Sequence, residues 1–360
     1  MKKIIFMIVL LALFLFGCSK TETANIQSKN GLPVVRVAHQ PAYHALPTWL
    51  GIQKGWAKEA GISVDFKSYT AGGDQVAALG KKEWDIGVMG AAPSLLAALR
   101  YDSYIIAISN DESQTNDLWV RLDSPLLQNK GANPKHPDIY GSPEDYKGKI
   151  ILTTSMSTGH FATLATLKAM GVNSNEVKIV NTDQGQAFKF FEEGQGDIVQ
   201  FWAPSSYKAE EKGWVKVSSG KAAGAKVLGL VVADKDFADQ NPDLVNKWLE
   251  MYIRGLNEMK KNPVECESAL YDYYNNSAKM NISEEMIQKE FELRPVFDLN
   301  EQLSLFHVDA KNNSPLISNM QELATFFEEQ GRITARDKEK LEKNQFYVTD
   351  KFLKNLQKGD

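Results

Sequence analysis

The chain has 360 residues, with 41 basic and 45 acidic side chains and a formal net charge of −4. So mild a charge argues against nucleic acid or an acidic surface as a partner. A chain of this length exceeds what one hydrophobic core usually serves, so two lobes are expected. The two cysteines and five histidines form no cluster with metal-ligand spacing, and we expect neither a metal nor another cofactor.

The first residues have the composition of an export signal. Lys2 and Lys3 precede an apolar run, Ile4–Phe16, that is too short to span a membrane as a helix. Leu15-Phe16-Gly17-Cys18 resembles a lipobox, in which the cysteine is acylated and becomes the new N-terminus. We therefore expect a lipoprotein signal peptide at residues 1–17 and a lipid on Cys18.

The segment that follows Cys18 is polar and has no apolar period. Residues 18–32 therefore predict a flexible tether between the lipid and the folded part. Together these features predict an exported protein that its lipid holds at the membrane. The remaining Cys266 has no partner for a disulfide and lies in a helix-like stretch, where packing is its expected role.

The first part of the folded chain alternates between strands and helices. Val34–Ala38 predicts the first strand, and a helix with Trp49 and Trp56 follows it. Between them lies the turn His39-Gln40-Pro41-Ala42-Tyr43-His44. The alternation continues through Tyr104–Ile108, which indicates an α/β lobe.

Three later strands each lead into a turn of small residues and then into a helix. The units are Val64–Tyr69 with Thr70-Ala71-Gly72-Gly73-Asp74, Asp85–Met89 with Gly90-Ala91-Ala92-Pro93-Ser94, and Asp197–Phe201 with Trp202-Ala203-Pro204-Ser205. The last two share the order Asp-Ile, apolar strand, Ala, Pro, Ser. This repetition predicts two lobes of similar design.

A fourth unit of this kind has the clearest turn. Ile150–Thr154 is a β-branched run typical of a buried strand, and apolar residues recur at helical spacing from Phe161. Ser155, Ser157 and Thr158 stand between them, where hydroxyl groups cap the free N–H groups of a helix. The same N–H groups and the helix dipole favour an anion, so this turn is a candidate anion site.

The rest of the chain predicts two connections between the lobes and a helical end. Asp117–Arg121 reads as a strand that leaves the first lobe, and residues 128–146 as a polar loop. Val227–Val232 reads as the strand that returns. An amphipathic helix begins near Pro242, and the sequence from Ser283 onward is helical by composition.

Several motifs, in this order, resemble one known family. They are Gly90-Ala91-Ala92-Pro93, Ser157-Thr158-Gly159-His160-Phe161, Trp202-Ala203-Pro204, Glu301-Gln302-Leu303 and Phe327-Glu328-Glu329-Gln330-Gly331-Arg332-Ile333. Their succession is similar to that of the solute-binding lipoproteins of ABC importers in the taurine, aliphatic-sulfonate and nitrate group. The resemblance extends over almost the whole chain after Cys18.

The resemblance implies a type II periplasmic-binding fold, an α/β architecture with two lobes joined by a two-strand hinge. Lobe 1 would comprise residues 33–112 and 225–300, lobe 2 residues 113–224, and a C-terminal helical segment residues 301–360. The protein would be a monomer and not an enzyme. It would capture a small organic anion, most simply a sulfonate, between its lobes and deliver it to a permease and its ATPase.

The family's ligand-binding positions, transferred residue by residue, fall on the turns described above. They are His39, Gln40, Tyr43, Gly72, Gly73, Ala91, Ala92, Ser157, Thr158, His160 and Trp202. In open α/β sheets such turns lie at the edge where ligands bind. Tyr43, His160 and Trp202 could also be packing residues, and the sequence leaves both roles open. Since none of these turns holds Lys or Arg, neutral donors are expected to bind the anion.

One departure from the family concerns an amine on the ligand. Taurine receptors of this type place an acid near the return strand, whereas Lys226–Val231 here contains none. Asp74 or Asp117 could replace it. On this basis, sulfonates without an amine are expected to bind at least as tightly as taurine. Nitrate and a pyrimidine are alternative ligands, and an enzyme of thiamine-pyrimidine synthesis is an alternative of another class.

Overall fold

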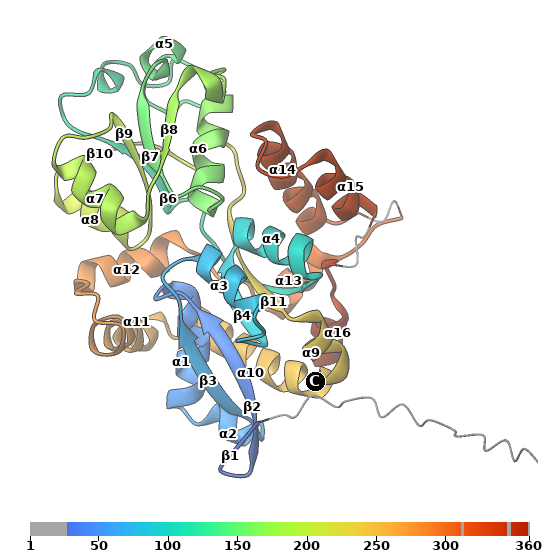
Figure 1. Ribbon diagram of the computed structural model, residues 1–360. Coiled ribbons are helices and arrows are strands. Elements are labelled where there is room, and N and C mark those ends of the chain that lie inside the picture. The colour runs from blue at the N-terminus through green and yellow to red at the C-terminus, as the bar shows by residue number, and fades with distance from the viewer. Residues whose placement is uncertain (1–26, 311–312, 344–346, 359–360) are drawn as a thin grey trace, which may run out of the picture.

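The computed structural model describes residues 27–310, 313–343 and 347–358 (Figure 1). The predicted signal peptide, Cys18 and most of the predicted tether lie outside these residues. The described end of the tether is a strand instead: β1 (Ser28–Lys29) pairs antiparallel with β2 (Leu32–His39). No helix within the described ranges is long and apolar enough to cross a membrane.

Lobe 1 is built on one mixed sheet and lobe 2 on another (Figure 1). The first sheet contains β1, β2, β3 (Ser63–Ser68), β4 (Ile86–Gly90), β5 (Tyr104–Asp111) and β11 (Leu228–Ala233). The second contains β6 (Asn116–Val120), β7 (Ile150–Thr153), β8 (Lys178–Asn181), β9 (Ile198–Trp202) and β10 (Val215–Ser219). Except for β10, all these strands from β2 onward match stretches that the sequence predicts as strands, including the short run Lys178-Ile179-Val180 at β8.

Helices cover the sheets of both lobes. Those of lobe 1 are α1 (Leu46–Gln53), α2 (Trp56–Glu59), α3 (Gly72–Leu79), α4 (Ala91–Tyr101), α9 (Lys235–Gln240), α10 (Pro242–Lys261), α11 (Pro263–Asp272) and α12 (Glu284–Leu293). Those of lobe 2 are α5 (Pro143–Tyr146), α6 (Thr158–Ala169), α7 (Gln184–Glu192) and α8 (Ser205–Glu211). The C-terminal segment contains α13 (Leu299–Phe306), α14 (Pro315–Glu329), α15 (Ala335–Lys343) and α16 (Lys351–Gln357).

The two sheets share one topology. In lobe 1, β2 lies parallel between β3 and β4, and β11 runs antiparallel beside β4. In lobe 2, β7 lies parallel between β8 and β9, and β6 runs antiparallel beside β9. In both sheets the antiparallel strand comes directly from the connection to the other lobe. The sequence prediction of two lobes of similar design is therefore correct.

An aspartate holds the start of the equivalent strand in each lobe. Asp85, just before β4, accepts a hydrogen bond from the backbone N–H of Arg36 on β2, at 2.8 Å. Asp197, just before β9, accepts one from the backbone N–H of Ile150 on β7, also at 2.8 Å. These carboxylates fix the register of neighbouring parallel strands at the edge far from the strand ends that meet the other lobe. The shared Asp-Ile motif is thus a structural feature.

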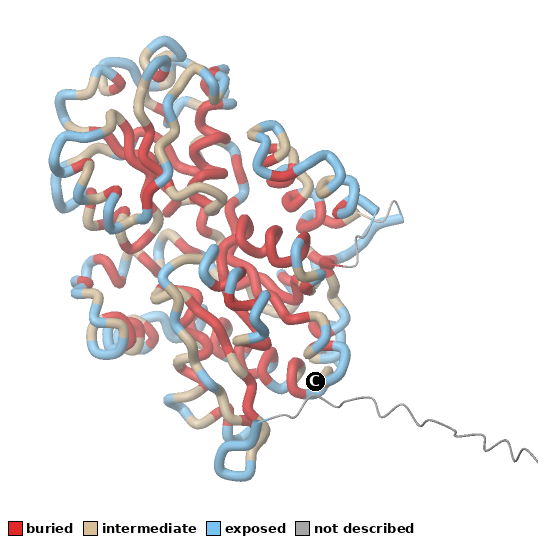
Figure 2. The backbone as a smooth tube through the Cα atoms, in the orientation of Figure 1, coloured by how far each residue is buried: buried red, intermediate tan, exposed pale blue. Residues whose placement is uncertain are grey.

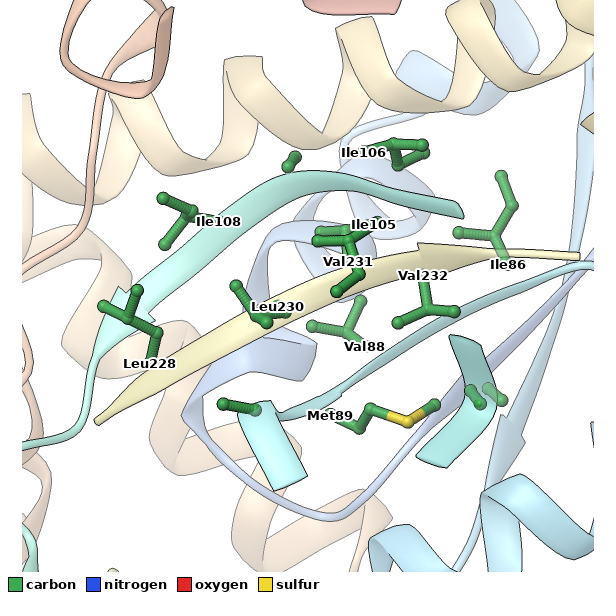
Figure 3. Packing of buried hydrophobic residues seen from close by; sticks show 14 of the residues in the cluster. Ile86, Val88, Met89, Ile105, Ile106, Ile108, Leu228, Leu230, Val231 and Val232 are labelled. Carbon is green, nitrogen blue, oxygen red and sulfur yellow. The ribbon is translucent and has the colours of Figure 1, made fainter. Parts of the chain in front are cut away.

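The core of lobe 1 lies around the central strands β4, β11 and β5. Their side chains include Val88, Ile108 and Val231, which are fully buried (Figure 3). Figure 2 shows this burial continuing through the centre of both lobes, whereas outer helices, loops and the edge strands β1 and β8 carry exposed residues. The parallel strand β4 is buried along its whole length, and its sequence Ile-Gly-Val-Met-Gly is a continuous apolar run, as expected for a strand covered on both faces.

Two crossings join the lobes, residues 112–115 between β5 and β6 and residues 220–227 between β10 and β11. They are hydrogen-bonded to each other. Glu112 N donates to Val227 O at 2.7 Å, Lys221 N donates to Ser113 O at 2.7 Å, and Val227 N donates to the Ser113 hydroxyl at 2.8 Å. The crossings therefore form one paired hinge, and the expected type II fold is confirmed.

Candidate functional site

A cavity of about 360 Å³ lies between the two lobes. Its wall is made by Gln40, Ala42, His44, Thr70, Ala71, Gly72, Gly73, Asp74, Gly90, Pro93, Leu96, Glu112, Thr115, Asn116, Thr154, Ser155, Met156, Ser157, Thr158, Asn181, Asp183, Trp202, Ala203 and Arg294. These residues follow the carboxyl ends of all six parallel strands, three from each lobe, and include the first crossing of the hinge. Such an edge is where open α/β sheets bind ligands.

Six of the residues predicted from the sequence line this cavity. They are Gln40, Gly72, Gly73, Ser157, Thr158 and Trp202. Gln40 donates from its side chain to the Gln75 carbonyl oxygen, and Trp202 donates its backbone N–H to Gln184 Oε1 at 3.1 Å. Both lobes therefore supply residues to one cavity.

His39 and Tyr43 do not line the cavity, because both point into the core of lobe 1. His39 is fully buried, and its ring stacks on Phe66 with 4.8 Å between centroids. Tyr43 is buried edge-to-face against Phe291, at 5.1 Å. The next residue with a ring, His44, lies at the wall in their place.

Ala91, Ala92 and His160 are also buried behind the wall. Ala91 and Ala92 begin α4 with their methyl groups in the core, so the flanking Gly90 and Pro93 form the surface. His160 is one turn into α6 and only 1% exposed. Burial lowers the pKa of its ring to about 4, so the imidazole is neutral at neutral pH.

Three helices, α3, α4 and α6, begin at the cavity wall. The Ser157 hydroxyl caps α6 by accepting the His160 backbone N–H at 3.0 Å. Helix starts present N–H groups that have no partner within the helix and carry a partial positive charge. Their convergence from two lobes suits an anionic group, as the sequence predicted for the turn before α6.

The lobes meet directly at one point of the cavity rim. A Cβ atom on Gly90, at the end of β4, would lie 2.1 Å from the Thr158 hydroxyl of lobe 2. A side chain larger than that of glycine would therefore obstruct this approach of the two lobes.

Gly90→Ala is expected to weaken ligand binding about tenfold or more, because the added methyl group holds the lobes apart. Calorimetry with the ligand provides the measurement. Gly73→Ala is the matched control, since a Cβ there meets nothing within 4 Å although Gly73 also lines the cavity. Equal affinities for the two variants would contradict closure at Gly90.

A charged group that no sequence motif predicted lies on the hinge side of the cavity. Arg294, directly after α12, donates from one nitrogen to Glu112 Oε1 and from another to Glu290 Oε2, the latter at 2.9 Å. All three side chains are at least nine-tenths buried. The turns predicted from the sequence hold no Lys or Arg, and Arg294 reaches the cavity wall from outside them. Glu112 and Arg294 are 182 residues apart, and no local pattern links them.

Glu112 lies beside the return strand, whose own sequence, Lys226–Val231, contains no acid. A Cβ on Gly229 of the return strand would lie 3.3 Å from Glu112 Oε1. Burial opposes its charge, yet Arg294 and His44 hold the pKa of Glu112 down to about 2. Oε1 faces Arg294, whereas Oε2 has no hydrogen bond to any described residue. Because Glu112 also lines the cavity, its carboxylate is a candidate partner for a ligand.

The two acids proposed from the sequence differ in position. Asp74 lines the cavity from the first turn of α3 and is exposed. Asp117 is buried in β6, away from the cavity wall, and Lys216 Nζ lies 3.6 Å from it. Burial raises the pKa of Asp117 to about 7, with Lys216 opposing the rise. Asp117 is thus not available to a ligand in this cavity.

The acids outnumber the cation in the cavity. Asp74, Glu112 and Asp183 stand against Arg294 alone, and Arg294 is already shared with Glu290. His44 is neutral because burial lowers its pKa. No group of three or more His, Cys, Asp or Glu residues in the described part of the chain has the geometry to hold a metal ion.

Comparison with known proteins finds a family model and several relatives that resemble this chain. A family model described as NMT1/THI5 like matches residues 134–266. The chain is 24% identical over 293 residues to a Brachyspira hyodysenteriae protein assigned as an ABC transporter periplasmic binding protein, covering 81% of this chain and 84% of that one. It is 30% identical over 210 residues to the taurine-binding periplasmic protein of Escherichia coli, covering 58% and 61%. Residues 134–266 of the chain are thus similar to the NMT1/THI5-like family.

Solved structures show the same fold. The aliphatic sulphonate binding protein SsuA of Escherichia coli matches with a TM-score of 0.66 at 15% identity, covering 85% of this chain and 91% of that one. The nitrate-binding protein NrtA of Synechocystis PCC 6803 matches with a TM-score of 0.70 at 13% identity, covering 91% and 89%. The resemblance drawn from the sequence motifs is thereby confirmed, and these relatives are transport binding proteins.

Proposed function

We propose that this protein is the substrate-binding component of an ABC importer. In this role it captures a small organic anion between its two lobes. The observation that carries the proposal is the interlobe cavity, where six strand ends and three helix starts meet. The hinge at residues 112–115 and 220–227 supports a mechanism in which the lobes close on the ligand and the closed form engages the permease.

We further propose that the ligand carries an amine as well as its anion, as taurine does. The helix starts suit a sulfonate, while the free oxygen of Glu112 and the excess of acids suit an ammonium group. An anion without an amine would enter a cavity whose charged side chains are mostly negative. This reverses the sequence-based expectation that simple sulfonates bind at least as tightly as taurine.

Mass spectrometry of ligand carried through a native purification tests the proposal without assuming a ligand. An amine-bearing sulfonate or a related small zwitterion is the expected result. Nitrate would favour the function named for the Synechocystis protein. A pyrimidine would favour the alternative suggested by the family name, and a turned-over product would contradict the proposal that this chain is not an enzyme.

We propose that the protein is exported, monomeric and anchored by a lipid on Cys18. We also propose that its lobes and C-terminal segment have the residue limits predicted from the sequence. Among the supporting features are the export signal pattern at residues 1–17 and relatives that are periplasmic binding proteins.

Cys18→Ser should move the protein from the membrane to the soluble exported fraction, since the residue that carries the lipid is lost. Fractionation of cells followed by immunoblotting measures this. The Cys266→Ser variant serves as the control, because Cys266 is buried and its fraction should not change. A Cys18→Ser protein that stays in the membrane would contradict the lipid anchor.

A further inference from the structure

The C-terminal helix α14 touches both lobes. Figure 1 shows it beside α6 of lobe 2 and next to α4 and α13, and residue contacts join it to all three. Its Asn319 side chain also donates to the backbone oxygen of Lys226, in the second crossing, at 2.8 Å. The helix α14 therefore contacts lobe 1, lobe 2 and the second crossing of the hinge.

On the lobe 1 side, α14 belongs to a firmly attached unit. Ile108 N, on β5, donates to Gln302 Oε1 of α13 at 2.8 Å. Lys340, on α15, donates to the backbone oxygen of Leu99 and pairs with Asp102, both at 2.8 Å and both at the end of α4. The helices before and after α14 are thus fixed to lobe 1.

On the lobe 2 side, α14 offers two neighbouring aromatic rings to the start of α6. Phe326 packs edge-to-face on Phe161, with 5.1 Å between centroids, and Lys168 Nζ lies 4.7 Å from its ring centre. Phe327 is fully buried and lies 6.0 Å from the ring of His160. These contacts cross between lobes and are apolar, so opening the lobes would expose them.

His160 connects these rings to the cavity. Its Nδ1 accepts the backbone N–H of Met156 at 3.3 Å. Met156 lines the cavity and has a left-handed backbone, with φ of 59°, which is uncommon for a residue with a side chain. The second ring nitrogen is buried with no partner among the described residues. His160 therefore supports the turn that carries Met156, Ser157 and Thr158.

We propose that α14 is a latch fixed to lobe 1 that holds lobe 2 closed, and that His160 is the positioning residue through which it supports the ligand turn of residues 154–158. The latch does not depend on which ligand binds. The role of the turn in binding rests on the proposed function. Two measurements on the ligand-free protein therefore test the inference, and one with ligand extends it.

The first measurement is small-angle scattering of the ligand-free double variant Phe326→Ala/Phe327→Ala. Its radius of gyration should exceed that of the wild type, because the aromatic contacts of α14 with lobe 2 are lost. Phe352→Ala is the matched control, since this buried aromatic lies on α16, which packs on α10, α13 and β5. An unchanged radius in a folded double variant would overturn the latch. Phe327→Leu is the milder substitute if the double variant does not fold.

The second measurement is hydrogen exchange of the ligand-free turn, at the Met156 amide. His160→Leu removes the acceptor and should speed exchange there about tenfold. His160→Asn keeps an acceptor near the position of Nδ1 and should restore protection. Equal exchange in the two variants would reduce His160 to a packing residue and overturn its positioning role.

Calorimetry with taurine then tests whether the support of the turn by His160 affects ligand binding. His160→Leu should bind about tenfold more weakly than His160→Asn. If the wild type binds no taurine, the proposed ligand fails while the scattering and exchange results still decide the inference. If taurine binds all proteins equally, the turn has no part in binding.

Discussion

Replacing Arg294 with Met is expected to lower the free energy of unfolding by about 3–5 kcal/mol, because it leaves Glu112 and Glu290 buried without their cation. Arg294 is 3% exposed and bonds to both carboxylates. Burial of an uncompensated charge costs more than the loss of the hydrogen bonds themselves. Urea denaturation at pH 7, monitored by circular dichroism, measures the change.

The dependence of this effect on pH has a definite sign. The folded-state pKa of Glu112 is about 2, below its ordinary 4.5, so in the wild type its charge stabilises above about pH 4.5 and that stability is lost as pH falls towards 2. Without Arg294, burial raises the pKa of Glu112, and protonation removes the penalty as pH falls. The gap between wild type and variant should therefore narrow in acid.

A triple variant controls for the loss of the Arg294 side chain itself. Arg294→Met combined with Glu112→Gln and Glu290→Gln leaves no buried charge and should recover most of the lost stability. A triple variant as unstable as Arg294→Met would show that packing, and not charge, causes the effect. A single variant as stable as the wild type would contradict the buried ion-pair account altogether.

Glu112→Gln is expected to weaken taurine binding by about 10–100-fold, since it removes the charged acceptor proposed for the ammonium group. The same change leaves Arg294 with one carboxylate fewer, so ethanesulfonate should bind as tightly as before or more tightly. The ratio of the two affinities, measured by calorimetry on ligand-stripped protein, therefore reports the amine site alone.

Asp74→Asn is the matched control for that variant. Asp74 also lines the cavity, but it is exposed, so removing its charge should change taurine affinity by less than about threefold. An equal loss of taurine affinity in Asp74→Asn and Glu112→Gln would show that the ammonium group is attracted by the overall negative charge of the cavity and not by Glu112 in particular. A large loss in Asp74→Asn alone would place the amine at α3.

The strand-turn-helix units could be predicted because their signals are local. Ile150–Thr154 and Ser157 were sufficient to predict a buried strand and a capped helix, and the structure has β7 at Ile150–Thr153 and a cap at Ser157. Gln40, Gly72 and Trp202 came from the family resemblance, and the rule that strand ends share an edge explains why they line one cavity.

Side-chain direction and distant pairs could not be predicted in the same way. His39 and Gln40 are adjacent, yet one packs on Phe66 and the other faces the cavity. The sequence prediction looked for an acid close to Gly229 along the chain. In the fold, Glu112 comes close to Gly229 because it directly follows β5, the strand that pairs with β11. Arg294 follows α12, whose sequence contains no motif of a binding site. Its place at the hinge results only from tertiary packing.

Calorimetry of ligand-stripped protein with taurine and with ethanesulfonate is the most direct test of the central claim that the cavity binds an anion bearing an amine. The two ligands share the sulfonate and differ in the ammonium group. We predict that taurine binds at least about tenfold more tightly, as one charge-assisted hydrogen bond to Glu112 implies. Tighter binding of ethanesulfonate, or no heat from either ligand, would contradict the account.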